Sequence, residues 1–390
     1  MSARGLRGQT AIAGIGGTPY YKRGQSPDPE EALCIKAICA AAADAGVHPG
    51  DIDGFVSYGG EHSSGTQLMA ALGTRELRWS ATVWGGGGGG IPGALGLAAA
   101  AIVAGQATRV AVYRAMAQGA GGRVNEAVTI EHLSPHYTRN GIRSAAQIMA
   151  LRTQRLLAVD GVPASAMRAL ALASYYHAAR NPEAYAYGNT VTEADYDASR
   201  WISEPVRLYD CSRENDAAFA VLLTAADEAA SLRQLPAYLL SAPMGSEHGW
   251  GEIEESISPY TSAGFGPVAR RLWSESGYRP ADVDSAQIYT NFTGPAVAAI
   301  IEHGFCSAAE AGEFLTVKNL TAPDGELPVN TSGGDLAEGF VHGIGLVLEA
   351  VRQIRGTSSN QVSPSNLALI TGGPASRLVS SALLGTAATL

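Results

Sequence analysis

The sequence predicts an α/β fold built from two related halves with an insertion between them. Three observations predict it. A helix–turn–strand segment occurs twice, and so does a glycine-rich turn followed by an apolar helix and a strand. The region from about 118 to 203 matches neither half. Each half is therefore expected to pack helices on a sheet.

The first repeated segment covers residues 43–58 and residues 274–289. In each copy a helix that closes on glycine is followed by a proline turn and an apolar strand. A repeat at so long a spacing indicates two similar halves and not a solenoid of short units. Gly46, Pro49, Asp51, Asp53 and Tyr58 recur at a constant offset as Gly277, Pro280, Asp282, Asp284 and Tyr289.

The second repeated segment begins at glycine-rich turns. Gly85–Gly90 precede an alanine-rich helix that ends near Gly105 and a strand over 109–113, and Gly333–Gly334 precede a helix that ends near Gly356 and a strand over 367–371. We divide the chain into an N-terminal half, 1–230, which includes the insertion at about 118–203, and a C-terminal half, 231–390. The insertion is rich in polar and aromatic residues and is expected to carry substrate contacts.

Composition excludes several classes of protein. The chain has 390 residues, 46% of them hydrophobic, which suffices for a large core. Its net charge of -9 argues against nucleic-acid binding. No secretory signal or membrane span is visible, so we expect a cytoplasmic protein. The four cysteines and eight histidines show no metal-ligand spacing, and the glycine run is not a nucleotide loop, so neither metal nor cofactor is predicted.

Four motifs occur in an order that resembles the thiolase superfamily, in particular the sterol-carrier-type thiolases. They are Asp210–Ala218, Ala286–Phe292, Gly304–Cys306 and Pro328–Gly334. The resemblance extends over about residues 10–384. It implies a thiolase fold, with two halves of the βαβαβαββ type arranged in helix–sheet–helix–sheet–helix layers.

The departures from the thiolase pattern concern its catalytic residues. By the resemblance, the acyl-accepting cysteine falls at Gly88, at the start of the helix after the first glycine-rich turn. The catalytic histidine falls at Phe340, and the second cysteine is absent from residues 371–375. Acyl transfer through an acyl-cysteine would therefore have neither nucleophile nor base.

This pattern resembles the steroid side-chain aldolases of the superfamily. The resemblance implies retro-aldol cleavage of a β-hydroxyacyl-CoA, such as a 17-hydroxy steroid C22-CoA thioester, to a ketone and a short acyl-CoA such as propionyl-CoA. CoA would be part of the substrate. The branch carries tyrosine at the Tyr289 position, often followed by Asp where this chain has Thr290, and a Tyr-x-His-Gly sequence where this chain has Phe340-Val341-His342-Gly343.

The resemblance also implies partners. The aldolases of this branch work with a small protein that bears an OB fold and usually a zinc ribbon. We therefore expect a heteromeric complex around a homodimeric core, with the strand over 109–113 as a candidate dimer contact.

Retro-aldol cleavage needs a base for the β-hydroxyl, donors for the thioester oxygen and an acid for the enolate carbon. Tyr289, His342 and His248 are the candidate catalytic residues, because a phenol or an imidazole suits these tasks. The alternative interpretations are a buried strand tyrosine, a structural histidine at a helix start, and an exposed loop histidine.

The candidate substrate contacts come from the two glycine-rich turns. Backbone N–H groups of Gly88 and Gly89 at a helix start suit an oxyanion, and a glycine at 88 leaves room for a branched α-carbon. The same run is alternatively a close-packed turn. From the second half we add Asn330, Gly333, Gly334 and Phe340. Candidate contacts for the CoA phosphates are Arg114, Arg123, Arg139 and Arg143.

Two other functions stay open. The loss of tyrosine at Phe340 favours a non-catalytic acyl-CoA-binding or scaffold subunit of a heteromeric complex. A condensing acyltransferase with a non-cysteine mechanism is the other alternative.

Overall fold

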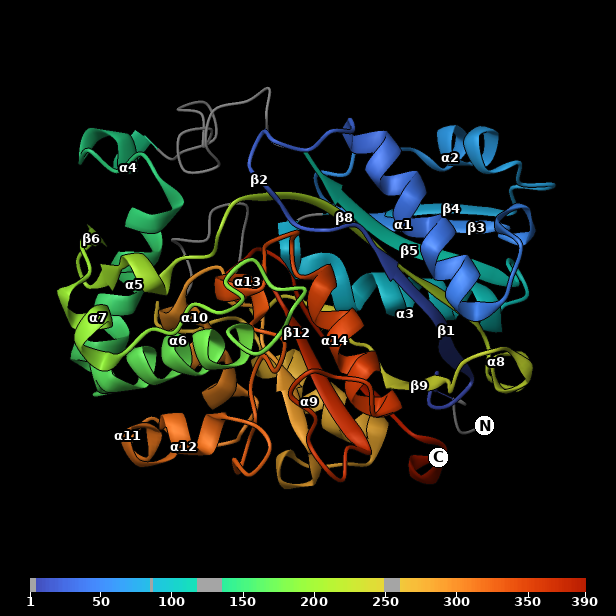
Figure 1. The fold of residues 1–390 in the computed structure, drawn as a ribbon. Coiled ribbons are helices and arrows are strands. Elements are labelled where there is room, and N and C mark those ends of the chain that lie inside the picture. The colour runs from blue at the N-terminus through green and yellow to red at the C-terminus, as the bar shows by residue number, and fades with distance from the viewer. Residues whose placement is uncertain (1–4, 85–86, 118–134, 249–259) are drawn as a thin grey trace.

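The structure is a computed structural model that describes residues 5–84, 87–117, 135–248 and 260–390 (Figure 1). A large mixed sheet of eleven strands forms its centre, and two further strands pair separately. The strands are β1 (Thr10–Gly17), β2 (Tyr21–Lys22), β3 (Gly54–Tyr58), β4 (Trp79–Val83), β5 (Arg109–Met116), β6 (Trp201–Ser203), β7 (Val206–Arg207), β8 (Asn215–Ala225), β9 (Ala237–Ser241), β10 (Met244–Gly245), β11 (Ser285–Gln287), β12 (Leu367–Gly372) and β13 (Val379–Gly385).

The helices follow the same repeat as the strands. They are α1 (Glu30–Ala45), α2 (Gly65–Leu72), α3 (Ile91–Val103), α4 (Pro135–Arg139), α5 (Ala145–Val159), α6 (Ala164–Ala178), α7 (Glu193–Ala198), α8 (Ala226–Ser231), α9 (Gly266–Ser276), α10 (Thr293–Glu302), α11 (Ala311–Phe314), α12 (Val317–Leu320), α13 (Gly334–Ala337) and α14 (Ile344–Arg355). None of the helices in the described part of the chain is long and apolar enough to cross a membrane.

The strand order confirms the predicted repeat. The two halves join where β1 pairs antiparallel with β9. Outward from this pair the first half continues through β8, β5, β3 and β4, and the second through β13, β12 and β11. In both directions two antiparallel pairings are followed by a parallel one. A parallel bridge between Ala286 and Val329 stands where β4 stands in the first half.

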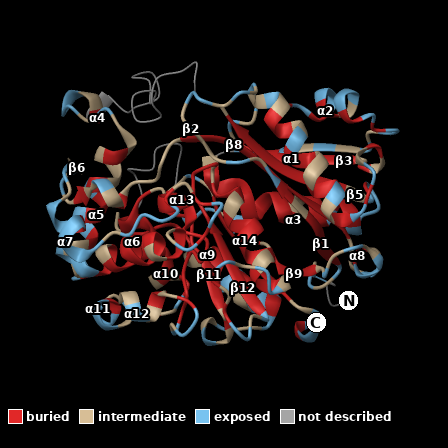
Figure 2. Cartoon of the chain, viewed as in Figure 1, coloured by how far each residue is buried: buried red, intermediate tan, exposed pale blue. Residues whose placement is uncertain are grey.

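Two helices, the apolar α3 and the amphipathic α14, lie between the halves of the sheet. Helix α3 contacts β3, β5 and β8 of the first half and β13 of the second, while α14 contacts β11 and β12 and also β8 and β1. Helices α1 and α9 cover the outer faces. Ten of the thirteen residues of α3 are buried, as expected for a helix that is apolar all round (Figure 2). The helix–sheet–helix–sheet–helix layering is thus as the resemblance to the thiolases implies.

The repeated turn also forms as predicted. Helix α1 ends at Gly46 and α9 at Gly277, with φ of 76° and 77°, the left-handed conformation that favours glycine. The second strand is shorter than expected, because β11 ends at Gln287. Beyond it, side chains replace the strand ladder: the Tyr289 N–H donates to Thr371 Oγ1 at 3.1 Å.

The helix expected to run from Gly334 to Gly356 is interrupted. Helix α13 ends at Ala337 and α14 begins only at Ile344. His342 and Gly343 both have left-handed backbone conformations, with φ of 47° and 81°, which a right-handed helix cannot contain. The resulting loop, residues 338–343, carries Phe340 and His342.

The described part of the insertion is a helical layer on the second half. Helices α5 and α6 pack on α10, and α6 also contacts α12 and α13. A buried carboxylate joins the two parts, because Asp210 accepts hydrogen bonds from the hydroxyls of Tyr196 at 2.8 Å and Thr293 at 2.6 Å.

The close approach of α1 to β1 yields a stability prediction. A Cβ atom at Gly16 would lie 2.2 Å from the Ala41 nitrogen and 2.6 Å from the Ala37 carbonyl oxygen. We expect Gly16→Ala to lower the free energy of unfolding by about 3 kcal/mol, because backbone must move to admit the methyl group. Urea denaturation measures it. Gly245→Ala is the matched control, since its nearest neighbour is 3.8 Å away. Equal stability of the two variants would contradict the packing described.

Candidate active site

Tyr289 occupies the position where a thiolase-like chain would carry its nucleophile. A Cβ atom at Gly88 would lie 2.1 Å from Cε2 of the Tyr289 ring and 2.4 Å from its hydroxyl. A Cβ atom at Gly343 would lie 2.6 Å from Cδ2 of the same ring. The expectation that Gly88 leaves room for a substrate carbon is therefore wrong, because the phenol fills that room.

The backbone around Gly89 is equally close-packed. A Cβ atom at Gly89 would lie 1.9 Å from the Leu378 carbonyl oxygen, and the Gly89 carbonyl accepts a hydrogen bond from Ser380. Gly372 and Gly373 pack against the backbone of Gly88 and Gly89. By the resemblance, the thiolase residues would fall at Gly88, at Phe340 and within residues 371–375. All three segments contact Tyr289, although none carries the thiolase residue. Gly85 and Gly86 lie outside the described residues.

Phe340 forms an apolar wall between Tyr289 and His342. Its ring centroid lies 6.0 Å from that of Tyr289, with an interplanar angle of 68°, and 5.3 Å from that of His342, at 86°. Both arrangements are edge-to-face, as aromatic quadrupoles favour. Phe340 contributes no exchangeable proton, so any proton transfer here must use other groups.

His342 accepts hydrogen bonds from a buried arginine. Arg114 places Nε 3.2 Å and Nη2 3.1 Å from His342 Nδ1. The same guanidinium forms an ion pair with Glu61 at 3.0 Å, and both charged side chains are only 3% exposed. The expectation that Arg114 binds a CoA phosphate is therefore wrong. Arg139 and Arg143 are exposed on the insertion, and Arg123 lies outside the described residues.

The loops around Tyr289 hold backbone strain. Asn330, His342 and Ala375 are the three described residues other than glycine with positive φ, at 53°, 47° and 60°. Each such conformation costs about 1–3 kcal/mol, and such residues cluster at functional sites. The Tyr58 hydroxyl secures one of them by donating to the His342 carbonyl oxygen at 3.0 Å.

Burial sets the protonation of the two aromatic candidates. It raises the pKa of Tyr289 well above the ordinary value, and the nearby carboxylate of Asp335 adds to the shift. Burial and the charge of Arg114 lower the pKa of His342 to about 3. At neutral pH, Tyr289 is therefore a neutral phenol and His342 a neutral imidazole.

Asp335 is a candidate that the sequence reasoning missed. Its carboxylate is buried and accepts the N–H of Thr290, the residue after Tyr289, at 2.9 Å. Burial raises its pKa to about 7, against the opposing effect of that hydrogen bond. An acidic residue directly after the apolar Gly333–Gly334 turn was the available signal.

Asn330, Gly333 and Gly334, expected as substrate contacts, form a buried support for the Tyr289 segment. Asn330 accepts the Ile288 N–H at 2.7 Å and donates to Thr290 Oγ1 at 3.1 Å. Gly334 packs directly against the Asn330 side chain. The contacts that they make are thus with the protein, and their role there is to position residues 288–290.

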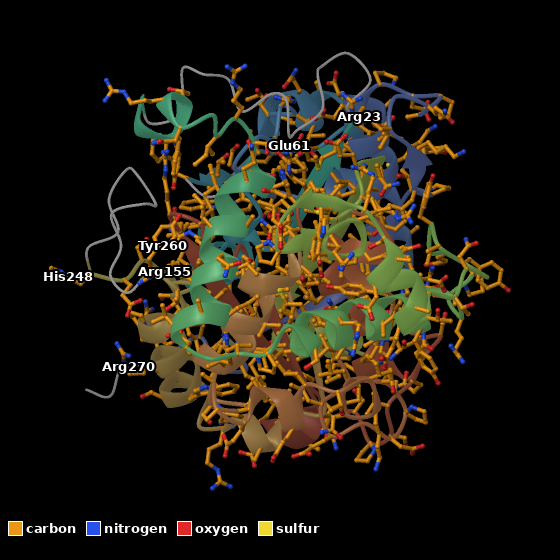
Figure 3. The ribbon with its side chains drawn as sticks, turned by 90° about the vertical axis from the view of Figure 1, so that its left-hand side faces the viewer. Arg23, Glu61, Arg155, His248, Tyr260 and Arg270 are labelled. Atoms are coloured by element: carbon orange, nitrogen blue, oxygen red, sulfur yellow. The ribbon has the colours of Figure 1, made fainter. Side chains whose placement is uncertain are left out.

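His248 is not brought to this cluster. It is exposed on the loop after β10, and Figure 3 shows its side chain at the outer edge of the molecule. A side chain so placed has no contact with the buried Tyr289, so its predicted catalytic role gains no support from this geometry.

No cysteine of the chain is suited to form an acyl-enzyme. The four cysteines are free, and burial raises the pKa of each thiol, to about 12 for Cys211 and about 11 for Cys306. Thiols that stay protonated at neutral pH are poor nucleophiles.

Comparison with known proteins gives closely similar relatives. Residues 247–384 match the family described as thiolase C-terminal domain-like. The chain is 35% identical to a 17-hydroxy-3-oxo-4-pregnene-20-carboxyl-CoA lyase of Mycobacterium tuberculosis, with 94% of this chain and 97% of that protein covered. It is 34% identical to a steroid side-chain-cleaving aldolase of Thermomonospora curvata, over 94% and 96%.

Solved structures of an aldolase and of a thiolase-like protein are also similar to this chain. A structure described as an Ltp2-ChsH2(DUF35) aldolase matches with a TM-score of 0.90 and 34% identity over 98% of both chains. A monomeric SCP2-thiolase-like protein of Mycobacterium smegmatis matches with a TM-score of 0.69 at 18% identity, covering 97% of this chain and 77% of that one. The second match shows likeness of fold.

The contact between Gly88 and Tyr289 predicts strong coupling between the two positions. Gly88→Ala should lower the free energy of unfolding by about 2–3 kcal/mol, because the methyl group overlaps the phenol ring. In a Tyr289→Ala background the same change should cost almost nothing, since the ring is gone. A double-mutant cycle by denaturant unfolding measures the coupling. Gly59→Ala serves as control, because its Cβ would meet nothing nearer than 3.4 Å. Additive effects would contradict the placement of the phenol.

Proposed function

This chain belongs to the family of thiolase-like steroid side-chain-cleaving aldolases, and from that membership we propose that it cleaves a β-hydroxyacyl-CoA thioester by a retro-aldol reaction. The observation that carries the proposal is the Tyr289 phenol, which fills the space of a nucleophile at Gly88. The site holds proton donors and a titratable carboxyl but no thiolate, which suits carbon–carbon cleavage without an acyl-enzyme.

The proposed reaction moves one proton from oxygen to carbon. A base takes the proton of the β-hydroxyl, the carbon–oxygen bond becomes a carbonyl, and the bond between the α- and β-carbons breaks. Its electron pair passes to the α-carbon as a thioester enolate. An acid then protonates that carbon, which leaves a ketone and a shorter acyl-CoA.

The described residues suggest how these tasks divide. Asp335, whose pKa burial raises to about 7, is ionised in part at neutral pH and suits the base. Tyr289 stays protonated and suits the acid. The proton that Asp335 gains can then return to the Tyr289 phenolate, which restores both groups for the next cycle.

The names of the relatives guide the choice of substrate. One relative is a lyase of a 17-hydroxy steroid carboxyl-CoA, and another is named for cleavage of the steroid side chain. We propose a 17-hydroxy steroid C22-CoA thioester, released as a 17-ketone and propionyl-CoA, with CoA as part of the substrate. Arg139 and Arg143, which are exposed, remain candidates for its phosphates, and so does Arg123, which lies outside the described residues.

We also propose a heteromeric complex with an OB-fold and zinc-ribbon partner. The supporting observation is that the description of the similar solved aldolase names two proteins, Ltp2 and ChsH2(DUF35). A covering protein would shield a bulky apolar substrate from water.

The homodimer proposal needs a different contact from the one expected. Strand β5, residues 109–116, is hydrogen-bonded on both sides by β3 and β8, so its backbone is not available to a second copy. Strand β4 is instead the outermost strand of this half, and Trp84 just beyond it is 90% exposed. An edge strand of this kind is open to pairing, which makes β4 our candidate dimer contact.

A non-catalytic acyl-CoA-binding or scaffold subunit is the second candidate function. The observation in its favour is Phe340, which places an apolar ring beside Tyr289 where the resembling aldolases have a tyrosine. A non-cysteine acyltransferase has no comparable observation in its favour among the described residues.

Turnover separates these functions. With the partner co-purified, the chain should convert a 17-hydroxy steroid C22-CoA thioester to the 17-ketone, followed by mass spectrometry. Tyr289→Phe should lower kcat about 100-fold or more without weakening acyl-CoA binding, because only proton transfer is lost. Tyr278→Phe is the control, since its hydroxyl donates to the Thr389 carbonyl oxygen at 2.9 Å, near the C-terminus and away from the site. Absence of ketone, with acyl-CoA binding intact, would support the scaffold.

The raised pKa of Asp335 predicts a pH dependence. Because a base must be ionised, kcat/KM should fall as pH drops through about 7, the pKa to which burial raises the carboxyl. Asp335→Asn should lower kcat/KM and abolish this acidic limb in the activity that remains. A wild-type profile flat between about pH 5 and about pH 8 would rule out Asp335 as the base.

A further inference from the structure

The arrangement around His342 assigns a role to Arg114 that goes beyond the reaction scheme. We infer that Arg114, paired with Glu61, is a positioning residue that locks His342 as a neutral imidazole with its hydrogen on Nε2, ready to donate to the thioester oxygen as it becomes an enolate. The inference rests on the proposed function for the identity of that oxygen, whereas the lock itself is a property of the protein.

The hydrogen bonds determine the tautomer. A guanidinium group can only donate, and Arg114 directs two nitrogens at His342 Nδ1, at 3.2 Å and 3.1 Å. Nδ1 must therefore offer a lone pair, so the ring hydrogen resides on Nε2. Among the described residues no group accepts a hydrogen bond from Nε2. This N–H is left for a ligand.

The guanidinium is itself held on several sides. Nη1 contacts Glu61 at 3.0 Å and donates to the Ala115 carbonyl oxygen at 2.9 Å. The Ala115 N–H donates to the same Glu61 oxygen at 2.8 Å, which fixes the carboxylate. Gly60 lies against the other end, since a Cβ there would be 3.0 Å from Nη2. Arg114 therefore cannot swing toward a ligand, and its Nε and Nη2 stay directed at His342.

The other groups around His342 reinforce its neutral form. Arg114 comes from β5, Glu61 from the loop after β3, and Tyr58 from the end of β3. Tyr58 holds the His342 carbonyl, and Phe340 lies edge-on to the ring at 5.3 Å. The cation is the charge in direct contact, and Glu61 lies behind it, so a second positive charge on the ring would be repelled. The lowered pKa of His342 agrees with this arrangement.

This assignment changes the role expected of His342. A histidine with a free pKa near neutrality would exchange protons with the substrate. A locked neutral ring instead stabilises developing negative charge by donating a hydrogen bond, which avoids reorganisation during the reaction. The positive charge of Arg114 behind the ring strengthens that donor.

Nitrogen NMR of the ring tests the lock directly. The full chain, with its partner bound, is labelled with ¹⁵N-histidine, and His342→Gln identifies the signals of His342 among those of the eight histidines. In the wild type we expect the neutral Nε2–H tautomer, unchanged from about pH 5 to about pH 8. Titration of His342 near its ordinary pKa, or a hydrogen on Nδ1, would overturn the inference in the wild-type protein itself.

A charge-balanced pair of substitutions tests Arg114 itself. Arg114→Leu combined with Glu61→Gln should release the tautomer, restore titration of His342, and lower kcat about 100-fold with little change in KM. Arg355→Leu with Asp44→Asn is the control, because it removes another largely buried ion pair, at 2.8 Å, away from the site. An unchanged His342 signal in the first double variant would overturn the role of Arg114. Correct tautomers without ketone formation would instead count against the proposed function alone.

Discussion

The packing of one phenol between two glycines is the constraint on which the site depends. Tyr289 lies where side chains at Gly88 or Gly343 would have to be, so neither position tolerates a Cβ while the ring is in place. The start of α3, where a helix dipole would favour a thiolate, thus faces a neutral hydroxyl. The absence of a nucleophile at Gly88 and the presence of the phenol are thus one feature of the packing, and this feature fits the proposed proton transfer in place of covalent acyl transfer.

The two halves of the molecule contribute unequally to this site. Tyr58 and Tyr289 are equivalent in the repeat, yet Tyr58 holds the backbone of His342 while Tyr289 stands at its centre. Arg114 and Glu61 also come from the first half and fix a histidine of the second. Because α3 and α14 lie between the two parts of the sheet and each contacts strands of both halves, residues of one half can reach those of the other. Residues of the first half thus hold His342 of the second half in place.

Much of this could be predicted from the sequence, because glycines and strand ends are local signals. Gly46 and Gly277 mark the turns that follow their helices. The offset between these two glycines also relates Tyr58 to Tyr289, which drew attention to Tyr289 as a candidate. The burial of a charged side chain, and its pairing with residues far away in the sequence, have no such local signal. From the sequence, Arg114 was a candidate contact for the CoA phosphates. Only the fold shows that Glu61 and His342 enclose it. Asp335 was missed because its shifted pKa depends on burial. The break before α14 depends on a strained His342, which sequence patterns do not reveal.

In the mechanism proposed, this site breaks a carbon–carbon bond through an enolate and never carries an acyl group. Turnover of the 17-hydroxy steroid C22-CoA thioester in D₂O, read by mass spectrometry of both product and protein, tests it most directly. We expect a single solvent deuterium on the α-carbon of the released acyl-CoA, and a protein mass unchanged throughout. A product without deuterium, or a protein that gains the mass of an acyl group, would contradict it.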